Sequence, residues 1–117
     1  MLRVLYVEDD DIATHIGKSM LNLFDNIQFT HAGSGYSALD IFQPNKFDLL
    51  LVDLGLPDIS GVELVRMIRK QYSQCPPVVA ITAHVNPNDD TPQGISRIYA
   101  KPLTHELVQE ILNCFHP

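Results

Sequence analysis

Short apolar runs alternate with helical patterns along the whole 117-residue chain. The run at residues 2–7 is nearly continuous and contains β-branched residues, which is typical of a strand buried on both faces of a parallel sheet. The runs predict strands at residues 2–7, 27–32, 47–52, 78–82 and 95–100.

Patterns of helical period fill the gaps between these runs. After residue 10, Ile12, Ile16 and Met20 recur at four-residue spacing, with Ala13 and Phe24 adjoining. A stripe of this period predicts an amphipathic helix.

Hydroxyl residues mark the starts of the other predicted helices. Ser34 precedes a helical pattern that contains Ala38, and its side chain can cap the helix. Ser60 and Glu63 form an S-x-x-E capping box, and Thr104 opens the last helix. Strands that alternate with helices predict an α/β fold, a doubly wound five-stranded parallel sheet in a single domain over residues 1–117.

Net charge, the length of the apolar runs and the cysteines exclude several classes of protein. Eight basic and 14 acidic residues give a net charge of −6, which argues against direct binding of nucleic acid. No apolar run is long enough to cross a bilayer, and the first residues turn acidic too early for a secretory signal. Cys75 and Cys114 lie in no CxxC motif and are interpreted as free thiols. We expect a cytoplasmic domain that itself makes no contact with a membrane, although its parent chain could be anchored in one.

Polar side chains follow four of the predicted strands. They are Glu8, Asp9 and Asp10 after the first strand, Asp53 after the third, Thr82 at the end of the fourth, and Lys101 after the fifth. In doubly wound sheets, ligands bind beyond the carboxyl ends of the strands, so these groups should converge there. Carboxylates so close together repel one another, and a hard divalent cation such as Mg²⁺ removes that repulsion. The sequence therefore predicts a Mg²⁺ site with an ammonium group nearby.

Such a site suits phosphoryl transfer onto a carboxylate. Asp53 would be the nucleophile, and Mg²⁺ would neutralise charge in the transition state. Lys101 and the Thr82 hydroxyl would hold the remaining phosphoryl oxygens. Each residue alone has an ordinary structural explanation, for example a charged helix start for residues 8–10. It is the combination at four strand ends that favours a functional site.

These motifs, in this order, resemble the receiver domains of two-component response regulators. The matching segments are VLYVEDD, LLLVDLGLPDISG, VVAITA and YAKPL. The resemblance implies a flavodoxin-like fold with strand order 2-1-3-4-5 and Mg²⁺ as cofactor. It implies a histidine kinase or a histidine phosphotransfer domain as partner. It also implies that the domain catalyses its own phosphorylation and dephosphorylation without being a turnover enzyme, although its parent chain could be a histidine kinase.

The resemblance assigns the acidic positions. Asp53 falls on the phosphoacceptor position. Asp9 falls on a direct Mg²⁺ ligand and Glu8 on a ligand that acts through water, while the backbone carbonyl of Gly55 completes the metal shell. Asp10 lies one place beyond the acidic pair and is left out.

The resemblance also assigns the last two strand ends. Thr82 matches the hydroxyl that moves toward the phosphoryl group, and Lys101 matches the cation that a cis peptide bond usually joins to a proline, here Pro102. Such domains usually carry an aromatic residue three places before the lysine, where Ile98 stands, whereas Tyr99 stands two places before it. Because an offset of one residue in a strand reverses the face, we expect Tyr99 to point to the opposite side of the sheet.

The segment between Thr82 and Lys101 departs from the family. It is a few residues shorter than usual, and residues 85–94 read VNPNDDTPQG. Prolines in that stretch predict a shortened or irregular fourth helix. In the family, positions matching Gly55 and His84 flank the approach of water to the phosphoryl group.

Several functional classes stay open at this point. LTHELVQEILNCF and ITAHV resemble receivers fused to hybrid sensor histidine kinases, and the alternative is a free-standing single-domain regulator. A pseudo-receiver that acts only as an interaction module would typically have lost a key residue. An FMN-binding flavodoxin would need a Ser-, Thr- and Gly-rich loop in place of residues 8–10. A haloacid-dehalogenase-type phosphatase would need a second aspartate where Gly55 stands.

Overall fold

The computed structural model describes residues 1–83 and 91–115, which form one sheet with helices on both sides. The parallel strands lie in the order β2-β1-β3-β4-β5. Their bounds are β1 (Leu2–Val7), β2 (Ile27–Ala32), β3 (Leu49–Asp53), β4 (Val78–Thr82) and β5 (Arg97–Ala100). The helices are α1 (Asp11–Asn22), α2 (Gly35–Ile41), α3 (Gly61–Gln71) and α4 (His105–Phe115). The predicted fold class and strand order are confirmed, and β3 and β5 differ from the prediction only at their ends.

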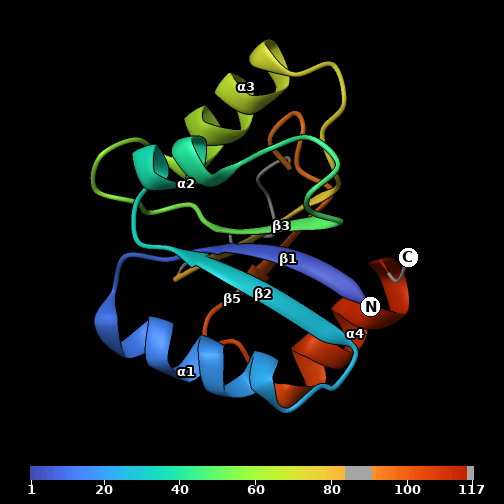
Figure 1. The fold of residues 1–117 in the computed structure, drawn as a ribbon. Helices are drawn as coiled ribbons and strands as arrows, with labels where there is room; N and C mark the ends of the chain where they lie inside the picture. Colours follow the sequence, from blue (N-terminus) through green and yellow to red (C-terminus); the bar gives the residue numbers. More distant parts are fainter. Residues whose placement is uncertain (84–90, 116–117) are drawn as a thin grey trace.

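Helices cover both faces of the sheet (Figure 1), with α2 and α3 on one side and α1 and α4 on the other. Alternate residues of β1 feed two separate cores. Leu5 and Val7 pack in the cluster that contains residues of α2 and α3, whereas Val4 and Tyr6 pack in the cluster with α1 and α4. Burial on both faces explains why the three inner strands, β1, β3 and β4, read as nearly continuous apolar runs.

The predicted helix starts are confirmed by their caps. Ser34 Oγ accepts a hydrogen bond from the Ser37 amide at 3.0 Å, and Ser60 Oγ accepts one from the Glu63 amide at 3.1 Å. The Glu63 carboxylate does not complete the expected capping box, because its Oε2 pairs with Arg66 at 2.7 Å. Each cap satisfies one of the amides that a helix start leaves without a partner.

Helix α1 forms as predicted, and Met20 and Phe24 of the predicted stripe pack against the core, but Ile12 and Ile16 do not. Gly17 and Leu21 are buried, whereas Ile12 is 74% exposed and Ile16 is 37% exposed. A Cβ atom at Gly17 would lie 2.1 Å from the Tyr6 hydroxyl oxygen, so only glycine allows this approach. Close contact at Gly17 turns the apolar residues Ile12 and Ile16 outward.

The structure confirms the orientation predicted for β5. Ile98 packs against the cluster on the α2–α3 side, and Tyr99 packs against the cluster on the α1–α4 side. No helix occurs in residues 91–96, which directly precede β5. The rest of the predicted irregular fourth helix, and His84, lie outside the described residues.

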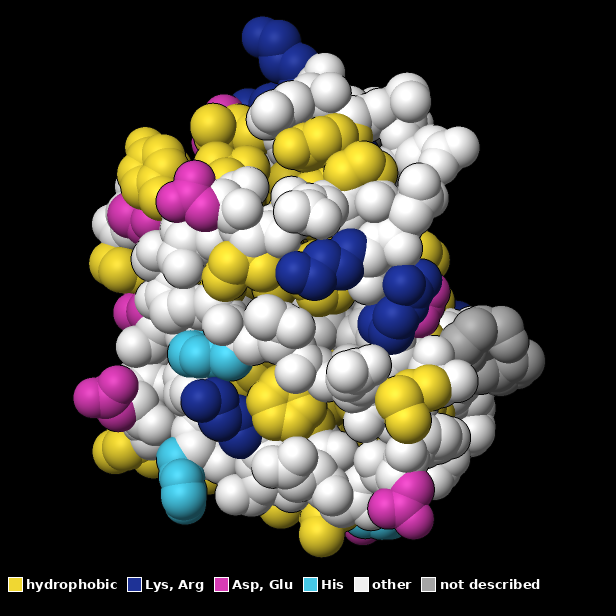
Figure 2. All heavy atoms as spheres, viewed as in Figure 1, with side chains coloured by type: hydrophobic (Ala, Val, Ile, Leu, Met, Phe, Trp, Pro, Cys, Tyr) yellow, Lys and Arg dark blue, Asp and Glu magenta, His cyan; other side chains and the backbone are white. Residues whose placement is uncertain are grey.

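None of the described helices is long and apolar enough to cross a membrane. On the face seen in Figure 2, the basic side chains lie in separate places, with polar, acidic and hydrophobic groups between them. The described residues therefore build no continuous basic surface on this face.

Candidate functional site

Three carboxylates meet at the carboxyl edge of the sheet. Glu8 and Asp9 follow β1, and Asp53 is the last residue of the neighbouring strand β3. One carboxylate oxygen from each lies within 4.8 Å of the others. Glu8 is fully buried and Asp53 is 5% exposed, while Asp9 is exposed. Parallel strand ends thus bring together residues 45 positions apart in the chain, as the sequence predicts.

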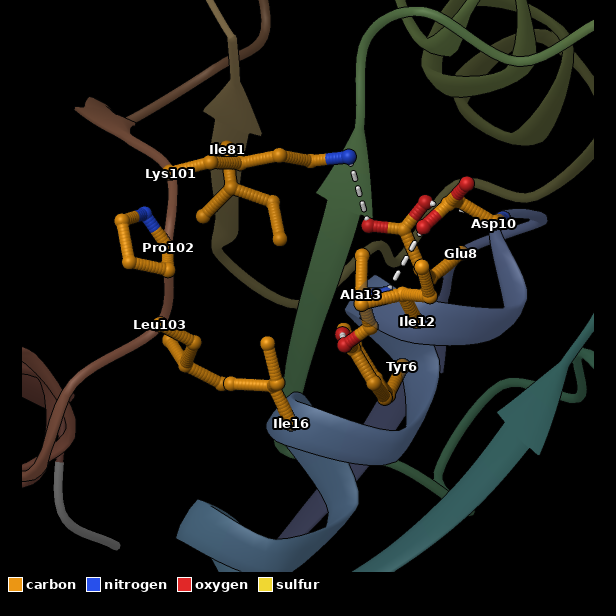
Figure 3. Close-up of a pocket in the computed structure, with 10 residues that line it drawn as sticks. All are labelled: Tyr6, Glu8, Asp10, Ile12, Ala13, Ile16, Ile81, Lys101, Pro102 and Leu103. Carbon is orange, nitrogen blue, oxygen red and sulfur yellow. Dashed lines mark hydrogen bonds and ion pairs between the residues drawn. The ribbon is translucent and has the colours of Figure 1, made fainter.

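Lys101 reaches into this cluster from the segment after β5. Its Nζ lies 2.8 Å from Glu8 Oε1 and 3.0 Å from Asp53 Oδ2. Figure 3 shows the side chain extending from the α4 side toward the Glu8 carboxylate. Burial lowers the pKa of Lys101, but the contacts with the two carboxylates outweigh it and raise the pKa above its ordinary value. Lys101 therefore carries its positive charge across the whole physiological range of pH.

Charge balance at the cluster favours a bound cation. Burial raises the pKa of Glu8 above its ordinary value, and the Lys101 ammonium offsets part of that shift. When ionised, three carboxylates beside one ammonium leave two negative charges in a small volume. Glu8 Oε1 is buried and accepts no hydrogen bond among the described residues, although it pairs with Lys101. Oxygen donors with an excess charge of −2 fit Mg²⁺, which takes one or two carboxylates and several waters.

The side chain of Asp53 is fixed on both of its oxygens. Oδ1 accepts a hydrogen bond from the Gly55 amide at 3.0 Å, and Oδ2 faces Lys101. Helix α3 begins directly against this residue, because a Cβ atom at Gly61 would lie 2.6 Å from the Asp53 carbonyl oxygen. The position of Asp53 is therefore set by the strand, by the loop after it and by the start of α3.

Of the remaining predicted residues, Thr82 lies at the edge of the site, whereas Asp10 lies outside it. Thr82 is half-buried at the end of β4, and its carbonyl accepts a hydrogen bond from the Lys101 amide at 2.8 Å, which places both at the site's edge. The Lys101–Pro102 peptide bond is cis, as the resemblance implies. Asp10 does not join the cluster, because its Oδ2 caps α1 by accepting from the Ala13 amide at 2.8 Å. For Asp10, the ordinary structural explanation considered for residues 8–10, a charged helix start, is therefore the correct one.

An apolar crevice of about 140 Å³ opens beside the acidic cluster. It runs between α1 and the segment that joins β5 to α4 (Figure 3). Ile12, Ile16 and Leu103 line its apolar part, and Glu8 and Lys101 line the end at the cluster. The outward-facing stripe of α1 and the charged site thus share one continuous surface.

Sequence reasoning missed a second contact that holds the loop after Asp53. Asp58 lies in that loop, and its carboxylate accepts hydrogen bonds from the amides of Tyr36 at 2.9 Å and Gly35 at 3.0 Å. These are the first two residues of α2, so Asp58 caps a helix from a distant part of the chain. The motif LPDISG was visible in the sequence, but nothing in it named α2 as the partner of Asp58.

The Asp58 cap should make stability depend on pH in the acid range. The amides of Tyr36 and Gly35 lower the pKa of Asp58 to about 2, below the ordinary value of about 3.9 that the unfolded chain retains. Because the folded-state pKa is the lower one, the stabilisation is complete above about pH 4 and disappears as pH falls toward 2. Asp58→Ala should lower the free energy of unfolding by about 1 kcal/mol at pH 7, the usual cost of losing a helix cap. Urea unfolding of the wild type and the variant at pH 7 and pH 3 measures this difference.

The control for this prediction is Asp25→Ala. The side chain of Asp25 is exposed and makes no hydrogen bond or ion pair among the described residues. The difference in unfolding free energy between wild type and Asp58→Ala should shrink at pH 3, whereas Asp25→Ala should follow the wild type at both values. An Asp58→Ala deficit of equal size at pH 7 and below pH 2 would contradict the assignment.

The family model described as "Response regulator receiver domain" matches residues 4–113. The chain belongs to this family. Members are receiver domains of two-component signalling, and receivers of this family bind Mg²⁺ at an acidic pocket such as the one formed here by Glu8, Asp9 and Asp53.

Individual relatives agree with the family assignment. The aerobic respiration control sensor protein ArcB of Escherichia coli (strain K12) is 35% identical over 107 residues, which cover 88% of this chain and 14% of that protein. Transcription factor prr1 of Schizosaccharomyces pombe is 32% identical over 113 residues, 94% of this chain and 21% of that protein. A solved receiver domain from Methylobacillus flagellatus has a TM-score of 0.86 at 25% identity, with 99% of each chain covered. The receiver therefore spans a small part of these two curated relatives.

Proposed function

We propose that this receiver domain takes a phosphoryl group from a phosphohistidine onto Asp53 in a Mg²⁺-dependent reaction, and later releases it to water. The observation that carries the proposal is the buried Asp53 carboxylate, which lies beside two further carboxylates and 3.0 Å from the Lys101 ammonium. An acidic cluster of this kind repels a phosphoryl group unless cations compensate the charge. Lys101 supplies one such cation.

The residues divide the chemistry between them. Asp9 and Asp53, with Glu8 through water and the carbonyl of Gly55, would hold Mg²⁺, which when bound neutralises charge on the transferring phosphoryl oxygens. A carboxylate oxygen of Asp53 attacks phosphorus, the P–N bond of the phosphohistidine breaks, and the imidazole leaves with the electron pair. Lys101 and the Thr82 hydroxyl hold phosphoryl oxygens during this exchange. Hydrolysis then removes the phosphoryl group: water attacks phosphorus, the P–O bond to Asp53 breaks, inorganic phosphate is released, and the Asp53 carboxylate is regenerated.

The partner would be a histidine kinase or a histidine phosphotransfer domain. The crevice beside the site supports this, because its apolar rim offers Ile12 and Ile16 to a helical partner while its charged end meets the phosphohistidine. Exposed apolar groups that adjoin a reactive site are typical of an interaction surface. One partner would then contact the apolar rim and deliver the phosphoryl group to Asp53 in the same complex.

Within this proposal we place the domain in a hybrid sensor histidine kinase. ArcB is a sensor protein, and the chain matches only 14% of its length, as expected for one module of a larger protein. A transcription factor is among the relatives too, so the parent chain is part of the proposal. The domain would act in the cytoplasm, where Cys75 and Cys114, both free here, stay reduced.

Intact-protein mass spectrometry tests the proposed function directly. Incubation with acetyl phosphate and Mg²⁺ should add one phosphoryl group to the protein, and the same incubation with EDTA should add none. The phosphoryl mimic beryllofluoride should bind only when Mg²⁺ is present. Absence of both the adduct and beryllofluoride binding would refute phosphorylation and favour a module that acts only through protein contacts.

A further inference from the structure

The backbone of Glu8 is held by side chains that the proposed chemistry does not use. Its carbonyl oxygen lies 2.8 Å from His31 Nε2, on β2, and 3.3 Å from Thr14 Oγ1, on α1. Its amide donates to the Ala32 carbonyl at 3.1 Å. Both polar groups of the Glu8 main chain are thus tied to the end of β2, with α1 adding a second donor.

The partner of His31 fixes which of its ring nitrogens acts as a donor. A carbonyl oxygen can only accept, so Nε2 of His31 carries the proton and donates it. The ring also has a set position, because His31 is the register partner of Tyr6 and the two ring centroids lie 5.8 Å apart. Since Tyr6 is buried beneath α1 at Gly17, the ring that supports His31 has little room to move.

This bond controls the residue that follows Glu8. A peptide unit is planar, so holding the Glu8 carbonyl also fixes the orientation of the Asp9 amide. Asp9 is exposed, and its side chain makes no hydrogen bond or ion pair among the described residues. Its carboxylate is therefore aimed at Glu8 and Asp53 by its main chain alone. Partners that orient the ligands of a metal are as much a part of the site as the ligands.

We infer that His31 is a positioning residue for the divalent-cation site: by donating Nε2–H to the Glu8 carbonyl it sets the direction of the Asp9 carboxylate. The inference rests on the proposed function, because it assumes that Glu8, Asp9 and Asp53 receive Mg²⁺. His31 touches neither the cation nor the phosphoryl group. Its loss should therefore weaken the binding of Mg²⁺ and leave the rate of phosphorylation at saturating Mg²⁺ nearly unchanged.

Calorimetric titration with Mg²⁺ provides the test. His31→Phe keeps an aromatic ring but removes the donor, and we expect its affinity to fall about tenfold, the lower end of the range for residues that orient metal ligands. His31→Gln places an amide donor where Nε2 lies and should recover most of the loss. His15→Phe, on the exposed face of α1, is the matched control and should bind as the wild type does.

Two further readouts separate positioning from a general structural defect. Without metal, hydrogen exchange at the amides of Asp9 and Asp10 should be faster in His31→Phe than in the wild type. With acetyl phosphate, the half-saturating concentration of Mg²⁺ should rise while the maximal rate is kept. If His31→Phe does not fold, Thr14→Val removes the other donor to the same carbonyl and should lower Mg²⁺ affinity by a smaller factor.

The outcomes distinguish this inference from the proposed function. A wild-type protein that binds no Mg²⁺ and takes no phosphoryl group would refute the proposed function. A wild type that does both, beside a His31→Phe variant of equal Mg²⁺ affinity, would overturn the inference and leave the function standing. A His31→Gln variant as weak as His31→Phe would also overturn it, since the ring and not its donor would then matter.

Discussion

Asp53→Asn should abolish the phosphoryl adduct completely. Asparagine has nearly the same shape, but a neutral amide lacks the anionic oxygen that attacks phosphorus. The exchange also removes one of the three clustered carboxylates, so Mg²⁺ should bind more weakly. Intact-protein mass spectrometry after incubation with acetyl phosphate and Mg²⁺ measures the adduct, and calorimetry measures the affinity for Mg²⁺.

The matched control is Asp58→Asn, in the loop after the acceptor. Asp58 is bound to the start of α2 and lies outside the acidic cluster, so this variant should still be phosphorylated. Asp53→Asn should unfold no more easily than the wild type in metal-free buffer, because one source of like-charge repulsion is gone. An adduct that persists in Asp53→Asn would move the acceptor to another residue and refute the assignment.

Lys101→Met should slow phosphorylation by about 10²- to 10³-fold, the size of effect seen when one charge-stabilising donor is removed from an active site. Methionine keeps the length of the side chain and its apolar stem but carries no charge. In the wild type the ammonium contacts both Glu8 and Asp53, so its loss leaves these buried carboxylates without a cation. The adduct should accumulate correspondingly slowly with acetyl phosphate at saturating Mg²⁺.

Mg²⁺ binding should respond in the opposite direction. Without Lys101 the cluster is more negative, so Lys101→Met should bind Mg²⁺ at least as tightly as the wild type. The variant should also unfold at a lower temperature in EDTA and recover in Mg²⁺, because the metal replaces the missing positive charge. Lys46→Met, at an exposed position over the Phe47 ring, is the control and should change neither rate nor affinity. An unchanged phosphorylation rate in Lys101→Met would contradict the role given to Lys101.

Much of the site could be predicted because its residues occupy defined places in the strand pattern. Glu8, Asp53 and Thr82 stand where buried apolar runs end, and Lys101 follows the last run. Parallel strands bring their carboxyl ends to one edge, so a correct set of strands was enough to bring these groups together. The reversed side of Tyr99 followed from the same two-residue period.

The rotation of α1 could not be read from its pattern. The stripe of Ile12 and Ile16 has the period of a buried face, yet the structure turns it outward. Gly17 determines which side of α1 faces the sheet, because a residue without a side chain lets the helix pack directly against the Tyr6 hydroxyl. The spacing of hydrophobic residues indicates that a helix has an apolar side. How deeply each of its residues is buried depends on how the helix packs against the strand beneath it.

The strands, the helix caps and the residues gathered at the carboxyl edge could be predicted from the sequence, because periodicity, capping and strand ends are properties of short stretches of chain. Which distant groups orient the site is visible only in the folded chain. His31 and Thr14 converge on the Glu8 carbonyl, and Asp58 reaches the start of α2. Each contact joins a side chain to a backbone group, and backbone groups are the same in every residue, so no residue type in the sequence identifies the partner.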